Sequence, residues 1–150
     1  MRLSREENRE NYNYFLRQLT AKGLIDRDRS KEHWGNIPIH VMEIECLYDI
    51  YEEGMRLIDL GCGAGNIIRY ASFIGYEVKG VEFDTRFEEH LLRYDVEFVD
   101  IRKLDLNILS EYDVVYSYKP LKEEFPKFIE GIKKHMKEGS HLITPEYSHK

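Results

Sequence analysis

Three glycines at alternate positions, Gly61, Gly63 and Gly65, directly follow the apolar run Arg56-Leu-Ile-Asp-Leu60, and few folds accommodate this arrangement. The string predicts a strand, a tight turn and then a helix. Glycines let the backbone approach a ligand without interference from Cβ atoms, and the helix that follows directs its N–H groups toward an anionic group. We therefore predict a nucleotide-cofactor loop at residues 61–65.

From residue 56 onward, short apolar runs alternate with segments of helical periodicity, which is typical of βαβ units and a parallel sheet. The predicted fold is α/β, an open and mostly parallel five-stranded sheet in the order 3-2-1-4-5 with helices on its faces. The predicted strands are 56–60, 77–82, 96–99, 113–116 and 141–144. The predicted helices are 66–74, 85–94 and 124–136, the last with Phe125, Phe128, Ile129, Ile132 and Met136 on one side.

The residues before this pattern predict two further helices. Ser4 and Glu7 form a capping-box pattern at the start of a helix over about 5–21. A second helix enters near Pro38 and ends at Gly54, with a predicted buried stripe of Met42, Cys46, Leu47, Ile50 and Tyr51. A chain of 150 residues is the size of one domain. We expect a single domain over 1–150, with an N-terminal helical layer at 1–54 and the core at 55–150.

The details of the loop distinguish between cofactors. The dinucleotide pattern G-x-G-x-x-G would place its third glycine at position 66, which is Asn66 here. Glu82 closes the next predicted strand, where a carboxylate can accept the hydroxyls of a ribose. Fewer than 70 residues follow Glu82, too few for the usual substrate domain of a dehydrogenase. An NAD-linked enzyme is therefore disfavoured.

Residues 55–145 resemble the class I S-adenosylmethionine-dependent methyltransferases, which have a Rossmann-like fold. Asp59-Leu-Gly-Cys-Gly-Ala-Gly65 is similar to their first motif, Glu82 to the acidic end of their second strand, and Tyr112-Asp-Val-Val-Tyr116 to their fourth strand. The resemblance implies S-adenosylmethionine as the cofactor. The residues that it implies for binding are Asp59 near the ammonium group, Gly61, Cys62, Gly63 and Gly65 under the methionine part, Glu82 on the ribose diol, Phe83, Asp100 and Ile101 around the adenine, and Tyr116 beside the sulfonium.

The catalytic residues are not defined by the sequence. Tyr116 and Lys119 are weak candidates at the exit of the fourth strand, together with Ser117, Tyr118 and Glu146 as substrate contacts. Cys62 is interpreted as a small filler without an adjacent base. Trp34 is either a lid or a packing residue, and His33 or His40 either a base or a surface residue. No paired histidine spacing is present, so no metal is assigned.

Composition excludes several classes of partner. The net charge is −6, and acidic residues predominate between 32 and 118, which disfavours nucleic acid and suits a cationic cofactor. No run approaches the roughly 18 apolar residues of a membrane span. Cys46 and Cys62 are too few for a disulfide framework. We expect a cytoplasmic protein without a membrane partner.

Two functions remain open at this stage. The first is a methyltransferase that acts on a small molecule or a protein side chain. The alternative is a non-catalytic module that binds S-adenosylmethionine or S-adenosylhomocysteine, or a subunit of a larger methyltransferase, because the family's final antiparallel hairpin is missing after His141-Leu-Ile-Thr144. The last strand then has no visible cover, which suggests a homodimer.

Overall fold

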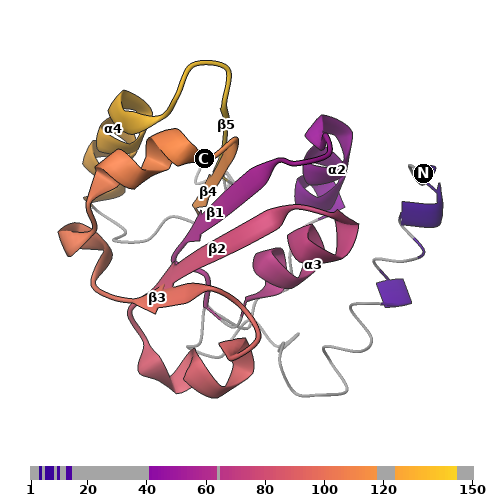
Figure 1. Ribbon diagram of the computed structural model, residues 1–150, viewed down its shortest axis with the longest axis horizontal. Coiled ribbons are helices and arrows are strands. Elements are labelled where there is room, and N and C mark those ends of the chain that lie inside the picture. The colour runs from indigo at the N-terminus through magenta and orange to yellow at the C-terminus, as the bar shows by residue number, and fades with distance from the viewer. Residues whose placement is uncertain are drawn as a thin grey trace, which may run out of the picture.

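A computed structural model describes residues 4, 6–8, 10, 13–14, 41–63, 65–117 and 124–144, except for the side chains of 41–43 and 125. Its centre is a five-stranded sheet (Figure 1). The strands are β1 (Arg56–Leu60), β2 (Glu77–Glu82), β3 (Val96–Phe98), β4 (Val114–Ser117) and β5 (His141–Ile143). Their order is β3-β2-β1-β4-β5, and every neighbouring pair is parallel. The predicted order is confirmed.

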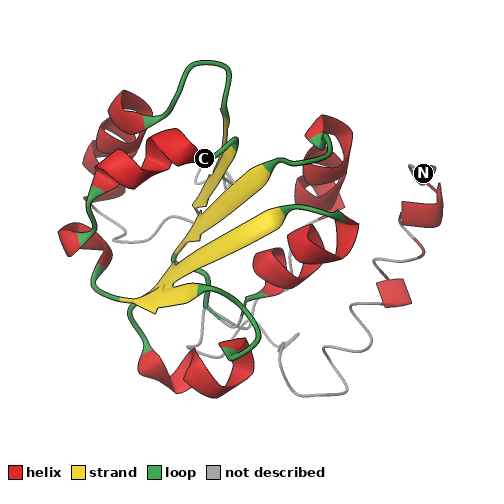
Figure 2. Ribbon diagram, viewed as in Figure 1, coloured by secondary structure: helices red, strands yellow, loops and turns green. Residues whose placement is uncertain are grey.

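Helices cover both faces of this sheet (Figure 2). The α-helices are α2 (Val41–Ile50), α3 (Asn66–Ile74) and α4 (Phe125–His135). Three 3₁₀ segments complete the connections, η2 (Thr85–Leu91), η3 (Ile101–Lys103) and η4 (Leu106–Glu111). In Figure 1, α2 and α3 lie on one side of the sheet, and α4 lies on the other.

Each face has its own apolar core, and the alternation of side chains along the strands assigns residues to them. Leu57 of β1 packs with Ile44 and Leu47 of α2 and with Ile67 and Tyr70 of α3. On the opposite face, the neighbouring Ile58 packs with a second group that includes Leu60, Val81, Leu109, Val115, Ile129 and Ile132. Burial on both sides explains why apolar residues are adjacent in both strands, at Leu57 and Ile58 of β1 and at Val114 and Val115 of β4.

The structure corrects the predicted stripe of α2. Cys46 is exposed, whereas Ile44 and Leu47 are 0% exposed and Tyr48 is 8% exposed. Residues 44, 47, 48 and 51 recur at helical spacing, and Ile50 and Tyr51 pack against the edge of the same core. Leu47, Ile50 and Tyr51 of the predicted stripe are therefore confirmed, and Cys46 is wrong. The side chain of Met42 lies outside the described residues. The predicted helix at 85–94 is also corrected, because η2 is a 3₁₀ segment that ends at Leu91.

The capping box at the N-terminus is confirmed. The Ser4 amide donates to Oε1 of Glu7 at 3.0 Å, and the Glu7 amide donates to Oγ of Ser4 at 3.1 Å. Asn8, on the following turn, is 1% exposed, and its Oδ1 accepts a hydrogen bond from the Tyr70 hydroxyl at 2.5 Å. Asn8 therefore contacts the core at α3.

Several predictions lie outside the described residues. They concern most of the helix over 5–21, Trp34, His33, His40, Tyr118, Lys119 and Glu146. Within the described part of the chain, no helix has both the length and the apolar character to cross a membrane. In the same part, no three His, Cys, Asp or Glu side chains gather closely enough to hold a metal ion.

Candidate cofactor site

The glycine-rich turn joins the carboxyl end of β1 to the start of α3, as the sequence predicted. Gly61, Gly63 and Gly65 have φ angles of 88°, 54° and 84°, a region that glycine adopts without strain. Gly65 caps α3, and its carbonyl accepts from the Arg69 amide at 2.9 Å. A Cβ atom at Gly65 would collide with Leu91 and reach Nη1 of Arg69 at 3.0 Å. Both conformation and space therefore require glycine at this position.

Four amides of this turn donate to acceptors within the protein. Those of Gly61 and Cys62 both donate to the Val81 carbonyl, at 2.8 and 3.0 Å, and the Gly65 amide donates to the Cys62 carbonyl at 2.8 Å. The Gly63 amide donates to Oε1 of Glu82 at 2.6 Å. A loop that cradles a diphosphate points its amides at the ligand. These four amides do not, so the turn suits close approach of an uncharged or cationic group better than a diphosphate.

Glu82 ends β2 beside this turn, and its carboxylate is held at both oxygens. Oε2 accepts from the Phe83 amide at 2.9 Å and from the Asp84 amide at 2.8 Å. Together with the bond from Gly63, three backbone N–H groups fix the carboxylate. A carboxylate has about four acceptor positions. One therefore remains, on Oε1, for a ligand hydroxyl.

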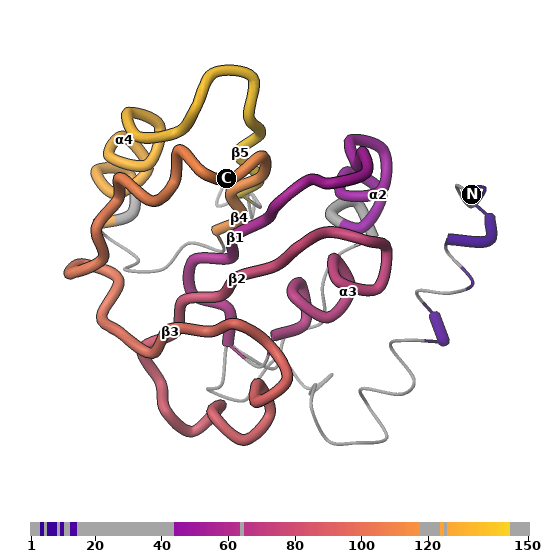
Figure 3. The backbone as a smooth tube through the Cα atoms, viewed as in Figure 1, coloured from indigo at the N-terminus to yellow at the C-terminus, as the bar shows by residue number. Residues whose placement is uncertain are grey.

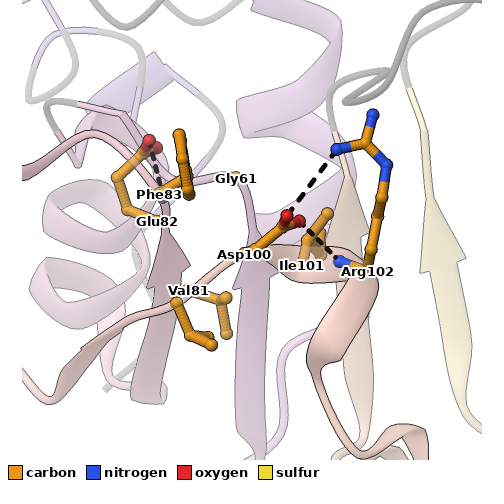
Figure 4. Close-up of a pocket in the computed structure, with 8 residues that line it drawn as sticks. Gly61, Val81, Glu82, Phe83, Asp100, Ile101 and Arg102 are labelled. Atoms are coloured by element: carbon orange, nitrogen blue, oxygen red, sulfur yellow. Dashed lines mark hydrogen bonds and ion pairs between the residues drawn. The ribbon is translucent and has the colours of Figure 1, made fainter.

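A pocket of about 220 Å³ opens between the carboxyl ends of β1, β2 and β3 (Figure 4). Its lining residues are Gly61, Val81, Glu82, Phe83, Val99, Asp100, Ile101 and Arg102. Figure 3 traces the chain from the end of β2 through η2 and back to β3, so the two strand ends that carry Glu82 and Asp100 are adjacent. Parallel sheets bind ligands at this end of their strands. Five predicted site residues meet here: Gly61, Glu82, Phe83, Asp100 and Ile101.

Two lining side chains present apolar surface of different kinds. Phe83 is 72% exposed, which leaves its ring available to a planar ligand. Ile101 is 8% exposed and belongs to the core that α4 covers. The pocket therefore combines a fixed apolar wall with an accessible aromatic ring, an arrangement typical of sites for heterocycles.

Arg102 lines the pocket, and the sequence analysis did not assign it. Its amide donates to Oδ1 of Asp100 at 3.0 Å, and its guanidinium lies 3.7 Å from Oδ2 of Asp100 (Figure 4). The guanidinium also lies 2.7 Å from Oε2 of Glu124. The hydrogen bond that the Arg102 guanidinium donates to Glu124 raises the pKa of Arg102. Two carboxylates thus offset this cation, and Glu82 adds further negative charge. The sequence signal that could have identified Arg102 as a pocket residue is its position directly after Asp100 and Ile101.

The other predicted site residues that the structure describes do not line the pocket. Asp59 and Tyr116 are register partners on β1 and β4, each 2% exposed, and Tyr116 packs in the core under α2 and α3. Cys62 is 7% exposed, and burial, followed by the charges of Asp59 and Glu82, raises the pKa of its thiol. A thiol in this state is not a nucleophile, in agreement with its interpretation as a filler. Lys119 lies outside the described residues.

Comparison with known proteins identifies the fold. No family model matches the chain. A curated relative, the ribosomal protein L11 methyltransferase of Dictyoglomus thermophilum, is 30% identical over an alignment of 116 positions, and the match covers 73% of this chain and 38% of the relative. The chain thus spans about two fifths of the length of that relative.

Solved structures of methyltransferases have a similar fold. A TehB-like S-adenosylmethionine-dependent methyltransferase from Corynebacterium glutamicum matches 93% of this chain and 73% of its own, with a TM-score of 0.56 and 19% identity. An RNA methyltransferase from Salinibacter ruber, in complex with S-adenosyl-L-homocysteine, matches 72% of this chain and 76% of its own, with a TM-score of 0.54 and 21% identity.

The chain has the fold of the class I S-adenosylmethionine-dependent methyltransferases. The Rossmann-like architecture, the strand order and the position of the glycine-rich turn all agree with that assignment. The resemblance seen in the sequence is confirmed at this level.

Proposed function

We propose that this chain binds S-adenosylmethionine and transfers its methyl group to a small molecule or a protein side chain. One observation carries the proposal: the pocket at the strand ends brings together Gly61, Glu82, Phe83, Asp100 and Ile101, which the sequence had assigned to one cofactor. Whole drug-sized ligands occupy about 300–1,000 Å³. A pocket of about 220 Å³ suits the adenosine part, with the amino-acid part over the glycine-rich turn.

The charge of the site favours this cofactor over a dinucleotide. Glu82 and Asp100 face the pocket, and Glu124 and Asp100 offset Arg102. S-adenosylmethionine carries a net positive charge, which a negative site attracts, whereas the diphosphate of NAD is repelled. The internal hydrogen bonds of the turn amides also favour S-adenosylmethionine over NAD, because they leave these donors unavailable to a diphosphate.

The roles of individual residues follow from their positions. Glu82 accepts a ribose hydroxyl, Phe83 stacks on the adenine, and Asp100 accepts from its exocyclic amine. Ile101 forms the apolar wall below the ring. Asp59 is buried behind the turn at the end of β1 and supplies negative charge near the ammonium group. Tyr116 and Lys119, at the exit of β4, remain our candidates for the region of the transferred methyl group.

The cofactor supplies a methyl group already activated by a positive sulfur. The protein then needs to hold an acceptor in line with the carbon–sulfur bond, and positioning of this kind provides several kcal/mol of barrier reduction. The name of the curated relative, a ribosomal protein methyltransferase, supports a protein side chain as acceptor. The acidic centre of the chain disfavours RNA, although one structural relative is named an RNA methyltransferase.

Two further parts of the proposal concern the whole protein. We propose a cytoplasmic location, because two free cysteines, one of them exposed, fit a reducing compartment. We also propose a homodimer that pairs through β5, the edge strand of the sheet.

Thermal unfolding with added ligand tests cofactor binding. A ligand at a hundred times its dissociation constant stabilises a fold by about 2.7 kcal/mol, and each kcal/mol is worth roughly 2–4 °C in Tm for a chain of this size. We expect Tm to rise by several degrees with S-adenosylmethionine and S-adenosylhomocysteine and to stay constant with NAD. Glu82→Ala should lose most of this response.

A matched control separates the pocket from general charge effects. Glu97→Gln removes a carboxylate from β3 that pairs with Lys79 at 3.8 Å and does not line the pocket. This variant should keep the full response. If the wild-type protein shows no shift with either sulfur compound, the proposal fails. Transfer of a labelled methyl group to a panel of peptides and small molecules then distinguishes an enzyme from a binding module.

A further inference from the structure

The carboxylate of Glu82 accepts three hydrogen bonds from the backbone, in addition to the position that it leaves for a ribose hydroxyl. Gly63 donates to Oε1 at 2.6 Å, while Phe83 and Asp84 donate to Oε2 at 2.9 and 2.8 Å. The bonds from Phe83 and Asp84 are local, because these residues follow Glu82 directly. The bond from Gly63 crosses from β2 to the middle of the glycine-rich turn, 19 positions away in the sequence.

This contact completes the attachment of the turn to β2. Gly61 and Cys62 donate to the backbone carbonyl of Val81. Because this acceptor belongs to the backbone, a change of the side chain at position 81 leaves it in place. The Gly63 amide is the third successive donor, and its acceptor is a side chain. The conformation of the turn at Gly63 therefore depends on the identity of residue 82.

We infer that Glu82 is a positioning residue for the glycine-rich turn and thereby sets the affinity for the amino-acid part of the cofactor, in addition to contacting the ribose. The inference rests on the proposed function, which places the amino-acid part over this turn. The bond to Gly63 is charge-assisted and short, so it fixes the backbone on which that part of the ligand lies. Without Glu82, the Gly63 amide loses its acceptor, and the surface under the amino-acid part is no longer fixed.

Two ligands separate this role from ribose binding. S-adenosylhomocysteine contains both the adenosine and the amino-acid part, whereas 5′-methylthioadenosine retains the adenosine and the thioether but lacks the amino acid. The ratio of their dissociation constants therefore measures how much the amino-acid part contributes. If Glu82 contacted the ribose alone, its removal would weaken both ligands equally and leave the ratio constant.

We expect Glu82→Ala to weaken both ligands and also to reduce the preference for S-adenosylhomocysteine by about tenfold, since hydrogen bonds to charged groups are worth roughly one such factor. Glu82→Gln is the second variant, in case the alanine variant does not fold. Its amide cannot accept at both ends, so it loses either the Gly63 bond or the two local bonds. Asp100→Asn is the matched control, and it should weaken both ligands by one common factor.

A measurement without any ligand tests the contact itself. The Gly63 amide proton, bonded to a carboxylate oxygen at 2.6 Å, should resonate downfield and exchange slowly with solvent. In Glu82→Ala it should move upfield and exchange faster, while Asp100→Asn leaves it unchanged.

The two readouts assign failure to different causes. A constant ligand ratio in Glu82→Ala and Glu82→Gln overturns the inference and leaves the proposed cofactor intact. An unmoved Gly63 amide also overturns it. If neither ligand binds the wild-type protein, the proposed function fails, and the inference about affinity fails with it.

Discussion

At the scale of single residues, Gly80 shows how closely the turn and the sheet are packed. It lies within β2, where an added Cβ would collide with Cδ1 of Ile68, approach Sγ of Cys62 at 2.8 Å and reach Cγ2 of Val96 at 3.2 Å. These three atoms come from α3, the glycine-rich turn and β3. A side chain at position 80 would therefore push apart the elements that surround the cofactor site.

We expect Gly80→Ala to lower the free energy of unfolding by about 1–3 kcal/mol, the usual effect of overpacking a core. Urea unfolding monitored by circular dichroism measures this change. Ile68→Val removes the colliding methyl group and should recover part of the loss in the double variant. Gly131→Ala in α4 is the control, because its Cβ would meet Cδ1 of Leu106 at an ordinary contact distance of 3.4 Å. Alanine also has the higher helix propensity, so this substitution should be neutral or stabilising. Equal destabilisation by both alanines would contradict this account.

The two cysteines make a second prediction at this scale. Cys46 is exposed and Cys62 is buried, and burial raises the pKa of both thiols, with Asp49 contributing at Cys46. Iodoacetamide should modify Cys46 first in the native protein, at a rate that still rises above the ordinary cysteine pKa of about 8.5. Cys62 should react only in urea. Mass spectrometry resolves the two sites, and Cys46→Ser should abolish the native-state reaction.

At the scale of elements, Asp113 joins the amino ends of three strands. Its Oδ2 accepts from the Arg56 amide at 2.8 Å at the start of β1, and its carbonyl accepts from the His141 amide at the start of β5. Its Oδ1 lies 2.6 Å from Nζ of Lys137, just after α4. The hydrogen bond from Lys137 lowers the pKa of Asp113, and the bond from the Arg56 amide acts in the same direction.

This pKa shift predicts a pH dependence of stability. A carboxylate whose pKa is lowered in the folded state stabilises the fold above its unfolded-state pKa of about 3.9, and the contribution disappears as pH falls through the folded-state pKa. The wild-type protein should therefore exceed Asp113→Asn in unfolding free energy at pH 7, and the difference should shrink toward pH 3. Urea titrations at several pH values measure it. A difference that is constant with pH would exclude the ionised carboxylate as its source.

The contact between Asn8 and Tyr70 makes a further prediction for the elements. Both side chains are buried, so Tyr70→Phe leaves the amide oxygen of Asn8 without this donor. Loss of about 1–3 kcal/mol of unfolding free energy is expected for such a group. Asn8→Ala should have a smaller additional effect in the Tyr70→Phe background than alone, which a double-mutant cycle measures. Additive effects would show that the two side chains are not coupled.

The elements also show which features the sequence could predict. The strands, and Glu82 at the end of β2, could be predicted because apolar runs and their polar ends follow a local period. Asp100 and Ile101 were assigned only through the resemblance to the methyltransferases. The exposure of Cys46 in α2 could not be predicted, since Cys46 and Ile44 are both apolar, and only packing against Leu57 and Tyr70 selects between them. The hydrogen bond from Gly63 to Glu82 and the ion pair of Arg102 with Glu124 join residues 19 and 22 positions apart, and no local pattern encodes them.

At the scale of the whole molecule, the sheet places its binding and structural functions at opposite ends. The carboxyl ends of β1, β2 and β3 hold the pocket, and the amino ends of β1, β4 and β5 meet at Asp113. Variants at Asp113 should therefore change stability without changing ligand specificity. Variants at Glu82 and Asp100 should change ligand affinity, because their side chains face the pocket.

The edge strand β5 leads to a prediction about the assembly of the protein. In the described part of the chain, β5 pairs with β4 alone. The His141 amide donates to Asp113, so by alternation the Leu142 amide faces the open edge. An open edge of this kind favours pairing with a second copy.

We expect light scattering after gel filtration to give the mass of a dimer, twice the 18.0 kDa of the chain. His141→Lys places a charge on the exposed start of β5 and should shift the equilibrium toward monomer, whereas His90→Lys on η2 should not. A monomer at all accessible concentrations would overturn the proposed homodimer.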